Sequence, residues 1–196
     1  MGRIVFVTGG VSSGKSEFAE NLCSGLECRD SIVLYVATSI PFDFEMEQKK
    51  ADHQLRRKDK NWYTIEAYKS IPREIGEFCS SNSVEKSVRK IILLDCVTMM
   101  ISNLIFDRNG EFDVDDADER ASVEKKVNAE FKTLLNFVKS ENIDIIFVTN
   151  EIGLGGISEN RLGRYFANLE GKVNKMIASE SDDAYLVVSG IPIKIK

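Results

Sequence analysis

Short apolar runs alternate along the chain with longer segments that have a helical spacing of apolar and polar positions. The apolar runs are strand-sized and rich in β-branched residues, and they cover residues 4–8, 32–37, 91–95, 143–149 and 184–188. Nearly every position in these runs is apolar, which is typical of strands covered by helices on both faces. The pattern therefore predicts an α/β fold with a mostly parallel sheet flanked by helices.

The segments between the strands predict helices at residues 16–26, 43–55, 72–79, 96–106, 121–140 and 161–179. The alternating stretch "WYTIEA", residues 62–67, indicates an extra strand. The closing stretch "YLVVSGIPIKIK" predicts a strand, a turn at Ser189–Gly190 and a last strand, which together form a C-terminal β-hairpin. Residues 107–120 are expected to form a solvated acidic loop, since they lack the glycine spacing of an EF-hand.

Residues 9–16, "GGVSSGKS", match the phosphate-binding pattern G-x-x-x-x-G-K-[ST]. An apolar strand precedes them and a helical segment follows, as this motif requires. The backbone N–H groups of such a loop and the helix N-terminus bind phosphate, the lysine reaches the β- and γ-phosphates, and the hydroxyl binds Mg²⁺. We therefore expect a nucleotide site made of Gly9, Gly10, Val11, Ser12, Ser13, Gly14, Lys15 and Ser16, with Ser16 as a metal ligand.

A second motif, "KIILLDC", is an apolar strand that ends at Asp95. Its carboxylate is placed to hold Mg²⁺ directly or through water, and it is also suited to capping the helix that follows. Together the two motifs predict a P-loop nucleotide-binding domain with a RecA-like sheet. The guanine-reading sequence NKxD of regulatory GTPases is missing, because "VTNEIG" lacks its lysine and aspartate.

The composition limits the remaining classes. The 196 residues are expected to form a single domain, 1–196, and the net charge of −5 argues against general binding to nucleic acid. No apolar run is long enough for a membrane span, and no signal peptide is expected. The four cysteines have no metal-like spacing, so we expect reduced thiols and a cytoplasmic protein.

The single histidine, His53, lies in the charged stretch "KKADHQLRRKDKNW". If the helix continued through Arg57, then Lys49, Lys50, Arg56 and Arg57 would share a face with His53. These cations would lower the pKa of His53, and a neutral imidazole is a nucleophile for phosphorus. A solvated helix face with an incidental histidine remains the alternative.

Several stretches together resemble one family closely, from Arg3 to Lys196. They are "VTGGVSSGKSEFAE", "LYVATS", "HQLRR…WYTIE", "LLDCVTMMISNLIF", "VTNEIGLGG", "ENRLGRYFANLEGKVN" and "LVVSGIPIKIK". The chain resembles the bifunctional adenosylcobinamide kinases / adenosylcobinamide-phosphate guanylyltransferases of cobalamin synthesis. Two prolines common in that family are replaced here by Lys58 and Ser158.

The resemblance implies two reactions. ATP or GTP phosphorylates the aminopropanol hydroxyl of adenosylcobinamide, and GTP then transfers GMP through a guanylylated histidine to give adenosylcobinamide-GDP. It implies His53, Lys15 and Asp95 as catalytic residues, Mg²⁺ on Ser16 and Asp95, and a homotrimer. It adds nucleotide contacts at Ala37, Thr38, Ser39, Gln54, Leu55, Arg56, Arg57, Glu66 and Asp95.

Two other functions remain open. One is a P-loop small-molecule kinase without guanylyl transfer, and the other is a nucleotide-gated RecA-like binding or assembly module. Asn150 and Glu151 end a strand on the expected ligand side of the sheet, but they also suit the capping of a turn. The stripe "MMISNLIF" is expected to be core or subunit interface rather than a corrinoid surface.

Overall fold

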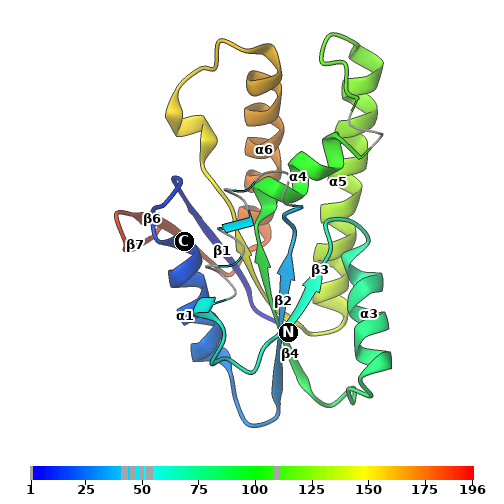
Figure 1. Ribbon diagram of the computed structural model, residues 1–196, viewed down its shortest axis with the longest axis vertical. Helices are drawn as coiled ribbons and strands as arrows, with labels where there is room; N and C mark the ends of the chain where they lie inside the picture. Colours follow the sequence, from blue (N-terminus) through cyan, green and yellow to red (C-terminus); the bar gives the residue numbers. More distant parts are fainter. Residues whose placement is uncertain (1, 41–43, 45–46, 49–50, 52–54, 108–110) are drawn as a thin grey trace.

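The computed structural model describes residues 2–40, 44, 47–48, 51, 55–107 and 111–196. Its strands form one seven-stranded sheet in the order β3-β2-β4-β5-β1-β6-β7 (Figure 1). Every neighbouring pair is parallel except β6 and β7, which form the predicted C-terminal hairpin. The strands are β1 (Ile4–Gly9), β2 (Ser31–Ala37), β3 (Tyr63–Glu66), β4 (Arg89–Asp95), β5 (Asp144–Val148), β6 (Asp183–Val188) and β7 (Ile191–Lys194).

The described helices are α1 (Lys15–Leu26), α3 (Ile71–Ser81), α4 (Val97–Ile105), α5 (Ala117–Ser140) and α6 (Arg161–Glu180), with a short 3₁₀ helix, η1 (Ile152–Gly155). The α/β prediction is confirmed, and the strand bounds agree with those predicted to within two residues. Much of the helix expected over residues 43–55 lies outside the described residues. Phe44, Glu47, Gln48, Ala51 and Leu55 are described, and they are helical.

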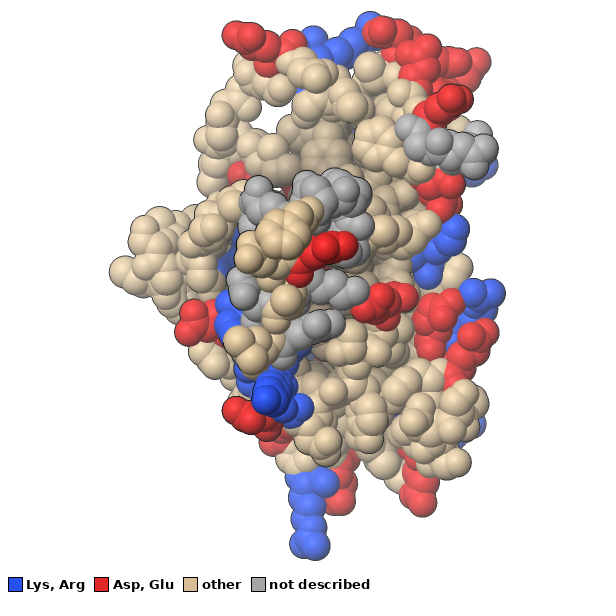
Figure 2. Space-filling model, in the orientation of Figure 1, with Lys and Arg blue, Asp and Glu red and all other residues tan. Residues whose placement is uncertain are grey.

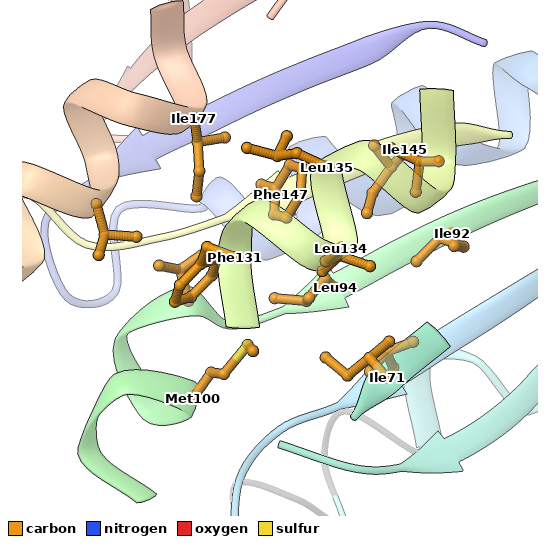
Figure 3. Packing of buried hydrophobic residues seen from close by; sticks show 14 of the residues in the cluster. Ile71, Ile92, Leu94, Met100, Phe131, Leu134, Leu135, Ile145, Phe147 and Ile177 are labelled. Carbon is orange, nitrogen blue, oxygen red and sulfur yellow. The ribbon is translucent and has the colours of Figure 1, made fainter. Parts of the chain in front are cut away.

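Alternating side chains of the buried strands point to opposite faces of the sheet. Val5 and Val7 pack with Ala19 and Cys23 of α1 on one face. On the other face, strand residues pack against α3, α4, α5 and α6, with Phe131 of α5 near the centre of the cluster (Figure 3). Because both faces are covered, the strands need to be apolar throughout, as the sequence is.

The stripe at residues 99–106 lies largely in this core. Met100, Ile101, Leu104 and Ile105 of α4 are each at most 2% exposed. The expectation that the stripe packs inside the protein is confirmed. In the described part of the chain, no helix combines the length and the apolar character that crossing a membrane requires.

The start of α5 differs from the prediction. The helix begins at Ala117 instead of Ala121, so residues 117–120 of the expected acidic loop are helical. The Asp116 side chain accepts hydrogen bonds from the backbone N–H groups of Asp118 and Glu119, and both acids lie in the first turn. The cap and the helix dipole stabilise an acidic helix start. Figure 2 shows acidic side chains gathered at this end of the molecule.

Candidate functional site

The connections after β1 and β5 leave the sheet toward opposite faces. The chain passes from β1 into α1 on one face, whereas from β5 it passes through η1 into α6 on the other (Figure 1). These two strands are neighbours, with Val7 in register with Val148. In parallel α/β sheets, such a divergence opens a crevice at the carboxyl ends of the strands, and ligands bind there.

The phosphate-binding motif forms a tight loop between β1 and α1. Gly14 has φ of +89°, and Ser13 N–H donates to the Gly10 carbonyl at 3.2 Å before α1 begins at Lys15. A side chain at Gly9 would lie 2.5 Å from the Val187 carbonyl oxygen, so the close approach requires glycine. The predicted strand–loop–helix context of the P-loop is confirmed.

The turn of the C-terminal hairpin supports this loop. Gly190 N–H donates to the Ser13 carbonyl at 2.8 Å, and a Cβ on Gly14 would lie 3.1 Å from the Gly190 Cα. Sequence reasoning did not find this support, because the two glycines are far apart in the chain.

Lys15 lies within the loop, and its Nζ donates to the Gly10 carbonyl at 2.9 Å. Burial lowers the pKa of Lys15, while Cys96, Asp95 and Glu170 act in the opposite direction. The cation therefore lies near acidic side chains, at the loop where a phosphate would add further negative charge. Ser16, the next residue, is half-buried.

The expected residues on β2, β3 and β4 end at the same edge of the sheet. Ala37 is in register with Asp95 on one side and with Glu66 on the other. The Tyr35 hydroxyl donates to Asp95 Oδ2 at 3.1 Å. Glu66 is exposed and Ser39 is half-buried, so both are accessible at this edge.

Thr38 has a structural role at this edge. It is 1% exposed, its hydroxyl donates to the Cys96 carbonyl at 2.7 Å, and Cys96 N–H donates back to that hydroxyl at 2.8 Å. Asn103 Nδ2 donates to the Thr38 carbonyl at 2.6 Å. The side chain of Thr38 therefore ties the ends of β2 and β4 together and is turned away from solvent.

Ser16 and Asp95 fit the predicted metal. They offer a hydroxyl and a carboxylate oxygen, which are donors that Mg²⁺ prefers. Among the described residues, no group of three or more His, Cys, Asp or Glu could hold a metal ion. A site of few protein ligands is the kind that Mg²⁺ completes with water and substrate phosphates.

The basic stretch is described from Leu55 onward, while Lys49, Lys50, His53 and Gln54 lie outside the described residues. The helical segment ends at Arg56, and Arg57 lies in a turn, so the condition that the helix continues through Arg57 is not met. Lys58 N–H donates to the Leu55 carbonyl at 3.2 Å, which closes this turn.

Arg57 is enclosed against α1 and β2 and is only 8% exposed. Its guanidinium lies 3.4 Å from Glu20 Oε1 and 3.4 Å from the centre of the Tyr35 ring. Arg56 and Lys60 reach the same carboxylate at 3.6 and 4.0 Å. Glu20 of α1, the helix that follows the P-loop, therefore binds three cationic side chains of the basic stretch.

Trp62 adds a second attachment of this stretch and is packed against Lys60. Its Nε1 donates to Glu27 at 2.8 Å, and the Lys60 ammonium lies 4.2 Å from the centre of the indole ring. The stretch that follows His53 is therefore fixed to α1 at Glu20 and to the residue after the end of α1, Glu27. The sequence did not single out Glu20 or Glu27.

A polar network joins α4, α6 and the residues after β5. Thr98 Oγ1 donates to Glu170 Oε1 at 2.5 Å, and it accepts from both N–H and Nδ2 of Asn150 at 3.0 Å. Glu170 is 1% exposed, and burial raises its pKa to about 7. The sequence contained a sign of this network, because Glu170 and Asn174 interrupt the buried stripe of α6.

The site defines the class of the protein. It has a P-loop that leads into a helix, and a carboxylate ends the strand two places away in the same sheet, which together define a protein of the P-loop class. The family model described as cobinamide kinase / cobinamide phosphate guanyltransferase matches residues 5–195. The chain belongs to this family, as the resemblance predicted.

Two curated relatives agree with this assignment. The chain is 37% identical over 193 residues to the Bifunctional adenosylcobalamin biosynthesis protein CobU of Escherichia coli, covering 98% of this chain and 99% of the relative. It is 36% identical, with the same coverage, to the protein of that name from Salmonella typhimurium.

Proposed function

We propose that the protein first phosphorylates adenosylcobinamide at its aminopropanol hydroxyl, with ATP or GTP as donor. It then transfers GMP from GTP to the product and forms adenosylcobinamide-GDP. The observation that carries the proposal is the P-loop facing Asp95, in a chain that matches the family over residues 5–195.

The cradle at residues 9–16 binds the triphosphate in both reactions. Lys15 exchanges the Gly10 carbonyl for β- and γ-phosphate oxygens, which compensate a buried cation better than a neutral carbonyl does. Ser16 and Asp95 are the residues that would hold Mg²⁺. When bound, the metal neutralises charge on the phosphate oxygens.

His53 is the proposed nucleophile of guanylyl transfer. Its ring nitrogen attacks the α-phosphorus of GTP, a nitrogen–phosphorus bond forms, and pyrophosphate leaves with the electrons of the broken bond. A phosphate oxygen of adenosylcobinamide phosphate then displaces the imidazole. The fixing of residues 56–62 on α1 supports this role, because it holds the stretch after His53 beside the P-loop helix.

The two arginines after His53 have different proposed roles. The side chain of Arg56 is 42% exposed, so its guanidinium is available to phosphate. The side chain of Arg57 is 7% exposed and its charge is already matched by Glu20, which suits an anchor rather than a phosphate ligand. Leu55, Gln54, Ala37, Ser39 and Glu66 remain proposed nucleotide contacts.

The assembly and location are also part of the proposal. We propose a single nucleotide-binding domain, 1–196, that acts in the cytoplasm as a homotrimer. All four cysteines are free thiols, which is usual for proteins of a reducing compartment.

Product analysis tests the proposed function. The protein is incubated with adenosylcobinamide, Mg²⁺ and either ATP alone or GTP alone, and the corrinoids are followed by chromatography and mass spectrometry. We expect adenosylcobinamide phosphate with a suitable donor and adenosylcobinamide-GDP whenever GTP is present. Phosphate product without the GDP product in the presence of GTP indicates a kinase alone, and nucleotide hydrolysis without either product indicates a nucleotide-gated module.

A further inference from the structure

Glu151 follows the end of β5 and lies beside the P-loop. Its backbone N–H donates to the Gly9 carbonyl at 3.3 Å, and its Oε2 accepts from the Thr8 hydroxyl at 3.2 Å. Gly9 is the first residue of the phosphate cradle, so both contacts hold Glu151 at its edge. The side chain is half-buried, which leaves it accessible to a ligand.

Glu151 lies in the connection after β5, next to the P-loop, which follows the neighbouring strand β1. In parallel α/β sheets, ligands bind where the connections after two neighbouring strands leave toward opposite faces. Here these connections carry the phosphate cradle and Glu151. A hydroxyl that attacks the γ-phosphorus needs room in line with the leaving oxygen and a group to take its proton. Glu151 is a carboxylate that is hydrogen-bonded to Thr8, the residue directly before the cradle.

The buried network behind Glu151 fixes the end of β5. Asn150 is held through its N–H and Nδ2 by Thr98, and its carbonyl accepts from Asn174 Nδ2 at 2.9 Å. Thr98 is in turn bound to Glu170, whose pKa responds to the charges of both Glu151 and Lys15. Glu170 therefore lies within reach of the charges of both Glu151 and Lys15, and the residue before Glu151 is held by three hydrogen bonds.

We propose that Glu151 is the carboxylate that accepts the proton of the acceptor hydroxyl in the phosphoryl-transfer step. This assignment rests on the proposed function. The hydroxyl oxygen forms a bond to the γ-phosphorus, and the bond from that phosphorus to the bridging oxygen breaks. The nucleoside diphosphate leaves with those electrons, and the hydroxyl proton passes to Glu151 and then to solvent.

The guanylyl steps do not need this carboxylate. A neutral imidazole attacks with a ring lone pair, and the second nucleophile is a phosphate oxygen that is largely deprotonated near neutral pH. Loss of Glu151 should therefore separate the two activities.

Glu151→Gln keeps the size of the side chain and its capacity to accept from Thr8, but removes most of its basicity. Glu159→Gln is the matched control, since Glu159 is an exposed acid of the same loop region. Phosphorylation of adenosylcobinamide is measured with ATP and with GTP, and self-labelling is measured with GTP labelled at the α-phosphate. We expect Glu151→Gln to lower kcat of phosphorylation about 100-fold or more. Its KM for nucleotide and its self-labelling should stay within about threefold of wild type, whereas Glu159→Gln should match wild type in all three.

The pH–rate profile of phosphorylation gives a second readout. Loss of a general base changes the pH dependence of the step that it serves, so the profile of Glu151→Gln should differ in shape from that of the wild type. A Glu151→Gln variant that phosphorylates within about threefold of the wild type, or that loses labelling in parallel with phosphorylation, overturns the assignment. Wild-type protein that labels itself but forms no adenosylcobinamide phosphate instead refutes the kinase half of the proposed function, and the role of Glu151 with it.

Discussion

The contact between Glu20 and Arg57 makes a strong prediction about stability. Their side chains are 5% and 7% exposed, so neither charge is compensated by water when its partner is removed. Breaking such a buried pair from one side costs about 3–5 kcal/mol, because a buried charge is left unpaired. Among the contacts of the described residues, Glu20→Met leaves Arg57 the Tyr35 ring, and we expect a loss of about 3–4 kcal/mol in the free energy of unfolding.

Arg57→Met should cost less than Glu20→Met. Arg56 and Lys60 still lie 3.6 and 4.0 Å from the Glu20 carboxylate, and they partly compensate its charge. We expect a loss of about 2–3 kcal/mol for Arg57→Met. In the double variant both buried charges are gone, so its loss should fall short of the sum of the single losses by about 1 kcal/mol or more.

Urea unfolding measures these values. Trp62 is the only tryptophan of the chain and lies in the anchored stretch, so its fluorescence reports this region, while far-UV circular dichroism reports the whole fold. Lys58→Met is the control, because Lys58 is an exposed cation of the same stretch and should change stability by no more than about 0.5 kcal/mol. A loss below about 1 kcal/mol for Glu20→Met, or single losses that add fully in the double variant, would refute the anchor.

Three other predictions concern the cradle, the buried network and the core. Lys15→Ala should lower both phosphorylation and self-labelling about 100-fold or more, since the lysine neutralises phosphate charge in each, and this is measured in the two activity assays. The pKa of Glu170 is raised from 4.5 to about 7, so the folded state holds this proton more tightly than the unfolded state does. The protein should therefore lose up to about 3 kcal/mol of stability as pH rises between these values. Glu170→Gln should lack this loss when urea unfolding is compared at about pH 5 and 8. Phe131→Ala should cost about 3–5 kcal/mol in the same assay and leave labelling of the folded protein unchanged.

Each of these has a clear contrary outcome. Normal phosphorylation by Lys15→Ala would mean that the loop is not the phosphate site. Equal pH dependence in wild type and Glu170→Gln would show that Glu170 does not titrate as its burial requires. A loss of about 1 kcal/mol or less for Phe131→Ala would place this ring outside a tightly packed core.

The parts of the fold that were predicted depend on local patterns. A short stretch of apolar positions and turn residues is enough to predict each of three elements: the strand before the P-loop, the strand ending at Asp95 and the last hairpin. The P-loop is a contiguous motif, so its geometry follows from adjacent residues. The early start of α5 was missed because the acidic residues look like a solvated loop until Asp116 is recognised as a cap.

The parts that were missed depend on contacts between distant residues. Arg57 was expected on a cationic face, but in the folded chain it meets Glu20, which lies 37 positions away. Glu170 and Thr98 are 72 positions apart, and Gly190 supports a loop near the other end of the chain. The spacing of residues along one helix or strand does not predict such pairs, since they form only when the folded sheet brings distant elements together.

Transfer of label from GTP to the protein tests the central claim most directly. The wild type and His53→Ala are incubated with Mg²⁺ and GTP labelled at the α-phosphate, and the adduct is tested for stability in acid and in base. We predict an acid-labile, base-stable adduct on the wild type that is absent from His53→Ala and is not formed equally from ATP. Active protein that takes up no label, or label that persists in His53→Ala, would contradict it.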